Sequence, residues 1–161
     1  MMQPLLDRAA GLGERLRARG ETIAISESSA GGLVSASLLA LPGASAYFVG
    51  GAVTYTTTAR GALVGITAEQ MAGLRSSSEP YALLLARTMR ERLGTTWGLA
   101  ETGASGPTGN RYGDPAGHTC LAISGSVELV RTLETGQAER WTNMLEFALA
   151  TLGLLDEALS G

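Results

Sequence analysis

The chain is poor in the residues and segments that mark a secreted, membrane-bound or zinc-dependent protein. Its 161 residues include one cysteine, Cys120, and one histidine, His118. An internal disulfide is therefore excluded, and a zinc site built on His and Cys is not expected. No apolar run reaches transmembrane length, and the N-terminus has no signal-peptide pattern. We expect a cytoplasmic protein with no membrane contact, no metal and no cofactor.

Basic runs and nucleotide-binding motifs are also missing. The formal net charge is −3 at pH 7, so nucleic acid is not an expected partner. Neither a Walker sequence nor GxGxxG is present. Hydrophobic residues make up 45% of the chain and charged residues 17%, as in a compact soluble protein. No linker or repeat divides the chain, so we expect a single domain over residues 1–161.

Strand and helix patterns alternate early in the chain, and a hairpin pattern follows. This order favours an α/β fold, a three-layer α/β/α sandwich with a mixed sheet. Trp97 and Trp141 are interpreted as core anchors, and a capping-box pattern at 67–70 predicts one further helix. The other helices are expected at 4–19, 33–39, 59–64, 80–93 and 139–159, and the strands at 22–27, 49–55, 97–101, 119–124 and 128–134.

The most informative stretch is 22–39, which reads as a buried strand, a small-residue turn and an Ala- and Leu-rich helix. A helix start carries unpaired N–H groups and partial positive charge, and glycines let a ligand approach the backbone. This predicts an anion-binding turn; the alternative is an ordinary serine-capped helix. The candidate binding residues here are Glu27, Ser28, Ser29, Gly31 and Gly32.

A second candidate segment is the glycine- and proline-rich loop 102–117, which is long for a compact domain. Its backbone N–H groups suit a phosphate or an oxyanion, and Thr102, Gly103 and Gly106 are its candidate binding residues. Open α/β sheets bind ligands at the carboxyl ends of strands. We therefore expect segments 28–32, 55–60 and 102–109 to meet at one edge.

Individual side chains are ambiguous when taken alone. His118 is interpreted as a strand-edge residue and Cys120 as inert packing, so no Ser/His/Asp triad is expected. Ser45 lies in a turn after Pro42 and Gly43, where a hydroxyl commonly serves the turn itself. Arg60 by itself would be a solvated helix charge.

The motifs together resemble the competence/damage-inducible CinA C-terminal domain family. Residues 26–32 read SESSAGG and are similar to the family's AESCTGG signature. Five further motifs follow in the family's order. PGAS at 42–45 stands for the family's PGSS, the Gly-Gly pair of 50–51 precedes Tyr55, and SE occurs at 78–79. TGASGP at 102–107 stands for the family's TGIAGP, and PAG at 115–117 for its PVG. The resemblance covers residues 5–159.

This resemblance implies a nicotinamide mononucleotide deamidase, an amidohydrolase that converts a small amide to the acid with release of ammonia. It implies Ser45 as nucleophile, Tyr55 and Arg60 as its catalytic partners, and Arg140 as a substrate-binding residue. The family has lysine where Arg60 stands, and arginine cannot act as a general base. The alternative is a non-catalytic binding protein for a pyridine nucleotide or another small ligand. In either case we expect a small-molecule ligand and a homo-oligomer.

Overall fold

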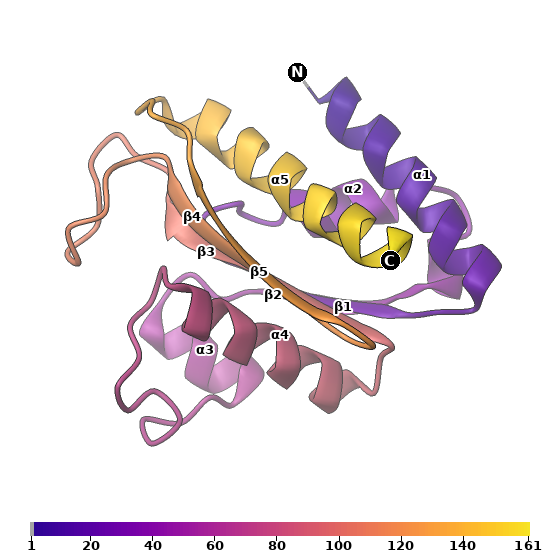
Figure 1. Cartoon of the computed structure of the whole chain (residues 1–161), viewed down its shortest axis with the longest axis horizontal. Coiled ribbons are helices and arrows are strands. Elements are labelled where there is room, and N and C mark those ends of the chain that lie inside the picture. The colour runs from indigo at the N-terminus through magenta and orange to yellow at the C-terminus, as the bar shows by residue number, and fades with distance from the viewer. Residues whose placement is uncertain (1) are drawn as a thin grey trace.

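A computed structural model describes residues 2–161 and contains a mixed sheet with helices on both faces (Figure 1). This confirms the expected α/β sandwich. The helices are α1 (Gln3–Arg19), α2 (Leu33–Leu39), α3 (Thr57–Val64), α4 (Glu79–Leu93) and α5 (Arg140–Ser160), with a 3₁₀ turn, η1, at Ala44–Ala46. The strands are β1 (Ile23–Glu27), β2 (Phe48–Val53), β3 (Trp97–Ala104), β4 (His118–Ser124) and β5 (Glu128–Glu134).

The sheet has the strand order β2-β1-β3-β4-β5. Strand β1 is parallel to both β2 and β3, whereas β3, β4 and β5 pair in antiparallel fashion. The carboxyl ends of β1, β2 and β3 therefore point to the same edge of the sheet. The chain segments that leave these three strands are brought together there, as the sequence predicts.

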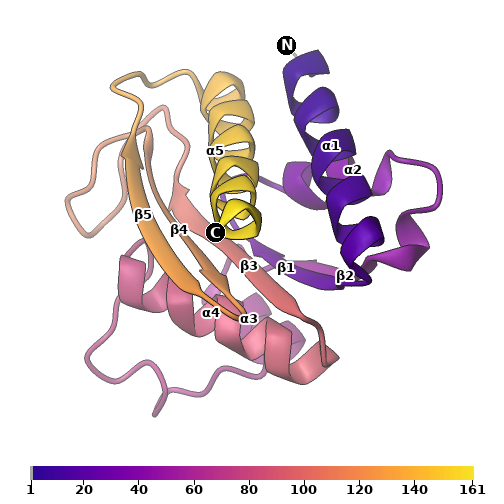
Figure 2. The ribbon, with the colours of Figure 1, turned by 45° about the vertical axis from the view of Figure 1, so that its right-hand side comes forward.

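Each face of the sheet has its own hydrophobic core. Helices α1, α2 and α5 cover one face, and α3 and α4 cover the other (Figures 1 and 2). Alternation along the strands separates the two sets of side chains. The first face presents Ile23, Ile25, Leu99, Leu121 and Ile123, and the second presents Ala24, Ala100, Cys120 and Ala122.

The small side chains on the second face let α4 pack close to the sheet. At Gly98 of β3, an added Cβ would lie 1.9 Å from the backbone carbonyl oxygen of Ala86 in α4. No side chain fits at that distance, so glycine here fixes how closely helix and strand approach. This contact joins the amino end of β3 to the middle of α4.

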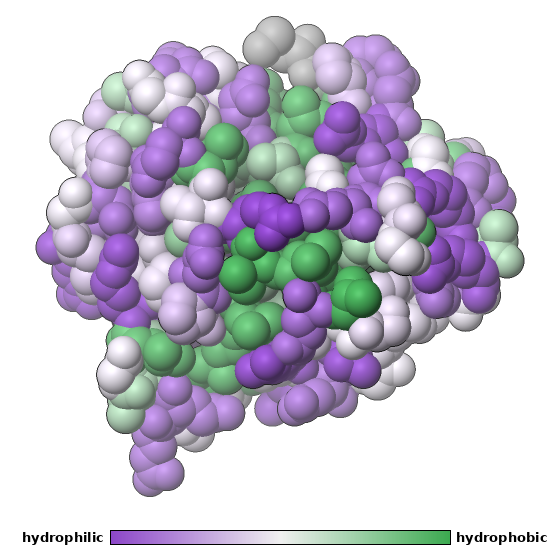
Figure 3. All heavy atoms as spheres, viewed as in Figure 1, coloured by the Kyte–Doolittle hydropathy of each residue, from purple (hydrophilic) through white to green (hydrophobic). Residues whose placement is uncertain are grey.

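The two edges of the sheet differ in character. Strand β5 carries exposed Glu128, Arg131 and Glu134, a charge pattern that discourages edge pairing. Strand β2 forms the opposite edge and exposes Val49 and Val53. The space-filling view shows a mostly polar surface with an apolar band at the level of the sheet (Figure 3). Among residues 2–161, none of the helices has both the length and the apolar character that a membrane span requires.

Two sequence-based expectations about the fold are wrong. The capping box forms, because Thr67 and Gln70 exchange hydrogen bonds, but only a turn follows. Gly73 adopts a left-handed φ of 77°, which ends the turn before a helix can grow. Trp97 is buried as expected, whereas Trp141, in the first turn of α5, is 50% exposed.

The close packing at Gly98 can be tested with a matched pair of substitutions. Gly98→Ala should lower the free energy of unfolding by about 3 kcal/mol, because the new methyl group displaces α4. Gly11→Ala lies in α1 with nothing within 4 Å of the new Cβ, and should raise it by about 0.5–1 kcal/mol. Urea denaturation of both variants measures the difference. If both substitutions changed the free energy of unfolding equally, close packing of α4 on Gly98 would be contradicted.

Candidate ligand-binding site

Two buried glutamates organise the turn between β1 and α2. Glu27, at the end of β1, is 1% exposed, and its carboxylate accepts hydrogen bonds from the backbone N–H groups of Gly32, Val34 and Ser35 at 2.8–3.1 Å. Burial raises the pKa of this carboxyl, while the N–H donors favour its charged form. The start of α2 is thus capped by the protein's own carboxylate.

Glu101, on β3, binds the first part of the same turn, at Ser28–Ala30. Its carboxylate accepts from the backbone N–H groups of Ser28 and Ala30 at 3.0 and 2.7 Å. The hydroxyls of Ser29 and Thr119 donate to its second oxygen. Glu101 is fully buried, so these four donors compensate the desolvation of its charge.

These bonds overturn the expectation that the turn offers free N–H groups to a ligand. The N–H groups of Ser28, Ala30 and Gly32 are taken by the two glutamates, and that of Gly31 by the Ser28 carbonyl. The Glu27 carboxylate is thus engaged by the backbone of the turn, and Glu27 lines neither of the two cavities described below. The half-buried Ser28 is the residue of this turn that lines the adjacent cavity.

A cavity of about 400 Å³ opens at the carboxyl ends of β1, β2 and β3. Arg60 lies in its wall, where it donates to the Ser76 hydroxyl at 3.2 Å and stacks 5.5 Å from the Tyr81 ring centre. Burial raises the pKa of the Tyr81 phenol. The residues that line this cavity include Ser28, Thr54, Tyr55, Arg60, Ser76, Ser77, Tyr81, Thr102, Gly103, Asn110, Arg111 and Tyr112.

The outer wall of this cavity is a turn built on Asn110. The Asn110 side chain accepts from the backbone N–H groups of Tyr112 and Asp114 and donates to the Asp114 carboxylate. The Arg111 guanidinium donates to the Tyr112 phenol oxygen at 3.0 Å. This bond, with a further one to Ser76, lowers the pKa of Tyr112. Tyr112 is therefore the phenol in this cavity that gives up its proton more readily than usual.

A second cavity of about 280 Å³ adjoins the first and shares Tyr55, Gly103 and Asn110 with it. Arg140 lies at its edge and donates to the Tyr55 phenol oxygen at 3.1 Å and to the Gly106 carbonyl. Ser105 also lines it, and its buried hydroxyl is the one buried side-chain polar atom of residues 2–161 with no hydrogen-bond partner. A buried hydroxyl without a partner marks a place where a ligand oxygen would be stabilised.

The structure brings together most of the expected site residues, but not Ser45. Tyr55, Arg60, Ser28, Thr102 and Gly103 line the first cavity; Tyr55, Gly103, Ser29, Gly106 and Arg140 line the second. Gly31 and Gly32 lie behind them in the turn, both with positive φ. Ser45 is exposed in η1, before the first residue of β2, whereas Tyr55 follows the last. One whole strand thus separates Ser45 from Tyr55 and Arg60 within one chain.

Several site residues were missed in the sequence. Glu101, Tyr81, Arg111 and Tyr112 stand in no motif, and only the length of loop 102–117 hinted at the last two. Each acts through contacts with residues far along the chain, which local patterns do not reveal. Tyr81, for example, reaches the cavity because it lies in the first turn of α4 beside Arg60.

The Glu101 network predicts a stability effect of a single hydroxyl. Thr119→Val preserves shape but removes a donor 2.7 Å from the buried carboxylate, and should lower the free energy of unfolding by about 2 kcal/mol. Thr58→Val, at an exposed position of α3, should change it by less than about 0.5 kcal/mol. Chemical denaturation compares them; a Thr119→Val protein as stable as the control would show that the carboxylate does not need this bond.

Comparison with known proteins identifies the family. The CinA C-terminal domain family matches residues 6–159. The chain is 41% identical over 128 residues to a CinA-like protein from an Anaeromyxobacter species, covering 78% of this chain and 31% of the relative. A CinA-like protein from a Nostoc species is 37% identical over 117 residues, which are 73% of this chain and 28% of the relative. The chain thus spans about a third or less of the length of these curated relatives.

Solved structures agree with this assignment. The competence/damage inducible protein CihA from Agrobacterium tumefaciens superposes with a TM-score of 0.89 at 26% identity, covering 98% of this chain and 96% of that one. A CinA superfamily protein from Klebsiella pneumoniae superposes with a TM-score of 0.90 at 22% identity, covering 97% and 98%, and shows the shared fold. The resemblance seen in the sequence is confirmed: this chain belongs to the CinA C-terminal domain family.

Proposed function

We propose that this protein is an amidohydrolase for a pyridine mononucleotide, such as nicotinamide mononucleotide, with Ser28 as its nucleophile. The observation that carries the proposal is that Ser28, Tyr55 and Arg60 line one cavity at the carboxyl edge of the sheet. A hydroxyl, a phenol and a guanidinium around one space suit attack on a carboxamide and stabilisation of the oxyanion that results. Family membership supports the same reaction class.

The second cavity supports a phosphorylated substrate. Arg140 supplies positive charge there, and the Ser105 hydroxyl and the glycine-rich loop supply donors. Because the two cavities share Tyr55 and Gly103, one mononucleotide could place its phosphate in the second cavity and its carboxamide in the first. Local positive charge at the site would hold the phosphate despite the negative net charge of the chain.

In the proposed reaction the Ser28 oxygen attacks the carboxamide carbon, and the C–N bond breaks. The serine proton passes to the leaving nitrogen, which departs as ammonia and leaves an ester on Ser28. Water then attacks this ester, and the nucleotide acid departs with the serine hydroxyl restored. Arg60 faces the oxyanion in both steps. Arg111 lowers the pKa of Tyr112, whereas burial raises the pKa of Tyr81. Tyr112 is therefore the phenol better suited to relay the proton.

The second candidate function is ligand binding without hydrolysis. Its support is the absence of a strong base: all 12 of the Lys and Arg residues are arginine, so neither this chain nor a second copy can supply a lysine. Arginine cannot act as a general base, and Arg60 is engaged by Ser76 and Tyr81. A binding protein would keep both cavities and lose only turnover.

Ammonia release from nicotinamide mononucleotide, measured beside calorimetric binding of the same compound, separates the two functions. We expect both binding and release of ammonia and nicotinate mononucleotide. Binding without ammonia would support the second function, and neither binding nor release would refute both.

The identity of the nucleophile can be tested with two serine substitutions. Ser28→Ala should reduce ammonia release by about 100-fold or more and leave the fold intact. Ser45→Ala, at the opposite end of β2, should leave the rate within about twofold. The reverse pattern would contradict the assignment of Ser28 and would require a second copy to carry Ser45 to the cavity.

Arg60→Lys tests whether a missing base limits the rate. A lysine beside Ser76 and Tyr81 can lose its proton when desolvated, so we expect ammonia release to rise by about tenfold or more. Arg60→Gln, which provides neither a base nor a charge, serves as the control and should not gain activity. If Arg60→Lys binds the nucleotide normally without any gain, proton removal from the serine is not the limiting step.

A further inference from the structure

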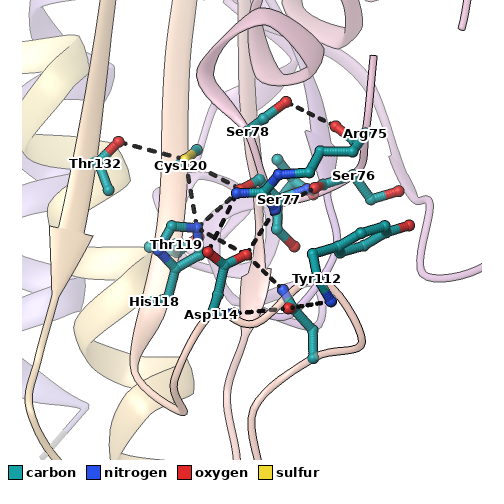
Figure 4. A network of polar contacts seen from close by, with 12 residues as sticks. Arg75, Ser76, Ser77, Ser78, Tyr112, Asp114, His118, Thr119, Cys120 and Thr132 are labelled. Atoms are coloured by element: carbon teal, nitrogen blue, oxygen red, sulfur yellow. Dashed lines mark hydrogen bonds and ion pairs between the residues drawn. The ribbon is translucent and has the colours of Figure 1, made fainter. Parts of the chain in front are cut away.

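His118 lies behind the outer wall of the first cavity, at the start of β4, and is 5% exposed. Figure 4 shows its ring among the residues that support this wall. Its Nδ1 atom contacts the Glu134 carboxylate on β5. Its Nε2 atom lies 2.8 Å from the backbone carbonyl of Ser77 and 3.5 Å from an Asp114 oxygen.

These partners define the protonation state of the ring. The Ser77 carbonyl can only accept a hydrogen bond, and the carboxylate of Glu134, whose side chain is 50% exposed, is likewise an acceptor. Both oxygens receive a hydrogen bond only when both ring nitrogens donate, and that form of the ring is the charged imidazolium. A neutral ring would turn a lone pair toward one of these oxygens.

The bond to Ser77 supports a turn that belongs to the cavity. Ser77 has a φ of 57° and is the one non-glycine residue of 2–161 with positive φ, a conformation that needs support from its surroundings. Its N–H donates to the Thr102 hydroxyl at 3.1 Å, and its carbonyl accepts from His118. The preceding residue, Ser76, accepts from Arg60. His118 is thus linked to Arg60 through one turn.

The contact with Asp114 supports the other part of the wall. Arg75 binds the Asp114 carboxylate with two hydrogen bonds, at 2.7 and 3.2 Å, and Asn110 donates to it at 2.8 Å. This carboxylate holds the turn that carries Tyr112. The imidazolium therefore stands between the two segments that form the outer wall.

We propose that His118 acts as a proton-dependent clamp: as an imidazolium it ties the Ser76–Ser77 turn and the 110–114 turn to the sheet, and on deprotonation it loses one of its two donors and its charge attraction to Asp114, which loosens the cavity wall. His118 is a positioning residue in this scheme and does not touch the ligand. Only the identity of the ligand whose affinity the clamp would regulate rests on the proposed function.

The surrounding charges agree with the clamp. Around the ring stand Glu134 on β5, Asp114 in the loop and Cys120 on β4, with Arg75 bound to Asp114 and Glu79 of α4 bound to Thr132 beside Cys120. Burial alone would lower the pKa of His118, but Glu134, the Ser77 carbonyl and Asp114 together raise it above 6.5. Burial raises the pKa of the Cys120 thiol, so it stays uncharged. Since the folded pKa is raised, the clamp is complete at low pH and is lost as the pH rises through that pKa.

The experiment uses the fact that His118 is the only histidine of the chain. Ring ¹⁵N signals of the labelled protein report its two nitrogens directly as the pH is raised. We expect both to be protonated at pH 6, with a midpoint above 6.5. Glu134→Gln keeps an acceptor but removes the charge, and should lower this midpoint. A ring with a single proton at pH 6 would overturn the proposal.

Amide hydrogen exchange then measures the release of the wall. After correction for intrinsic rates, protection at 76–77 and 110–114 should fall about tenfold across the midpoint, as expected for loss of one charge-assisted bond, while α5 stays unchanged. In His118→Gln, which can donate but cannot titrate, protection should not vary with pH. If protection of these segments in the wild type does not change across the midpoint of the His118 titration, the clamp is refuted.

The link to the ligand is measured separately. The affinity for nicotinamide mononucleotide should fall as the pH passes the midpoint in the wild type but not in His118→Gln. If this compound does not bind at any pH, the proposed function fails, and the ring and exchange measurements still decide the clamp. If it binds with the same pH dependence in both proteins, the wall does not control the site.

Discussion

The site depends on two carboxylates buried side by side, Glu27 at the end of β1 and Glu101 within β3. Unpaired charges in such a place would destabilise the fold. Glu27 and Glu101 are tolerated because backbone N–H groups and hydroxyls surround them. The same bonds define the path of the turn between β1 and α2, and they place Ser28 in the wall of the first cavity. Most of the turn's backbone donors therefore stabilise the two carboxylates and are not available to a ligand.

Positive charge at the site comes from arginine alone. Arg60, Arg111 and Arg140 line the two cavities of a chain whose net charge is −3. Guanidinium groups suit phosphate and oxyanion recognition, because they stay charged and present several donors. The same property removes the base that a lysine would provide. Proton transfer at the site would therefore fall to another group, and Tyr112 is the phenol whose pKa a neighbouring arginine lowers.

Much of the fold was predictable, because strand alternation and glycine or proline stops are local signals. The edge at which the 28–32, 55–60 and 102–109 segments meet followed from parallel strand order. The roles of particular residues did not follow. Glu101 acts on a turn far away in sequence, so nothing near it signals its function. Ser45 matched a family motif, but strand β2 carries it away from Tyr55. Trp141 was expected to be buried because of its residue type, yet its place on α5 exposes it.

We infer that the two joined cavities at the carboxyl edge form the ligand site within one chain. A crystal structure of the protein with nicotinamide mononucleotide would test this inference. We expect the carboxamide beside Ser28 and Arg60, and the phosphate beside Arg140 and Ser105. Nucleotide density beside Ser45, or elsewhere with both cavities free of it, would show that these cavities are not the ligand site.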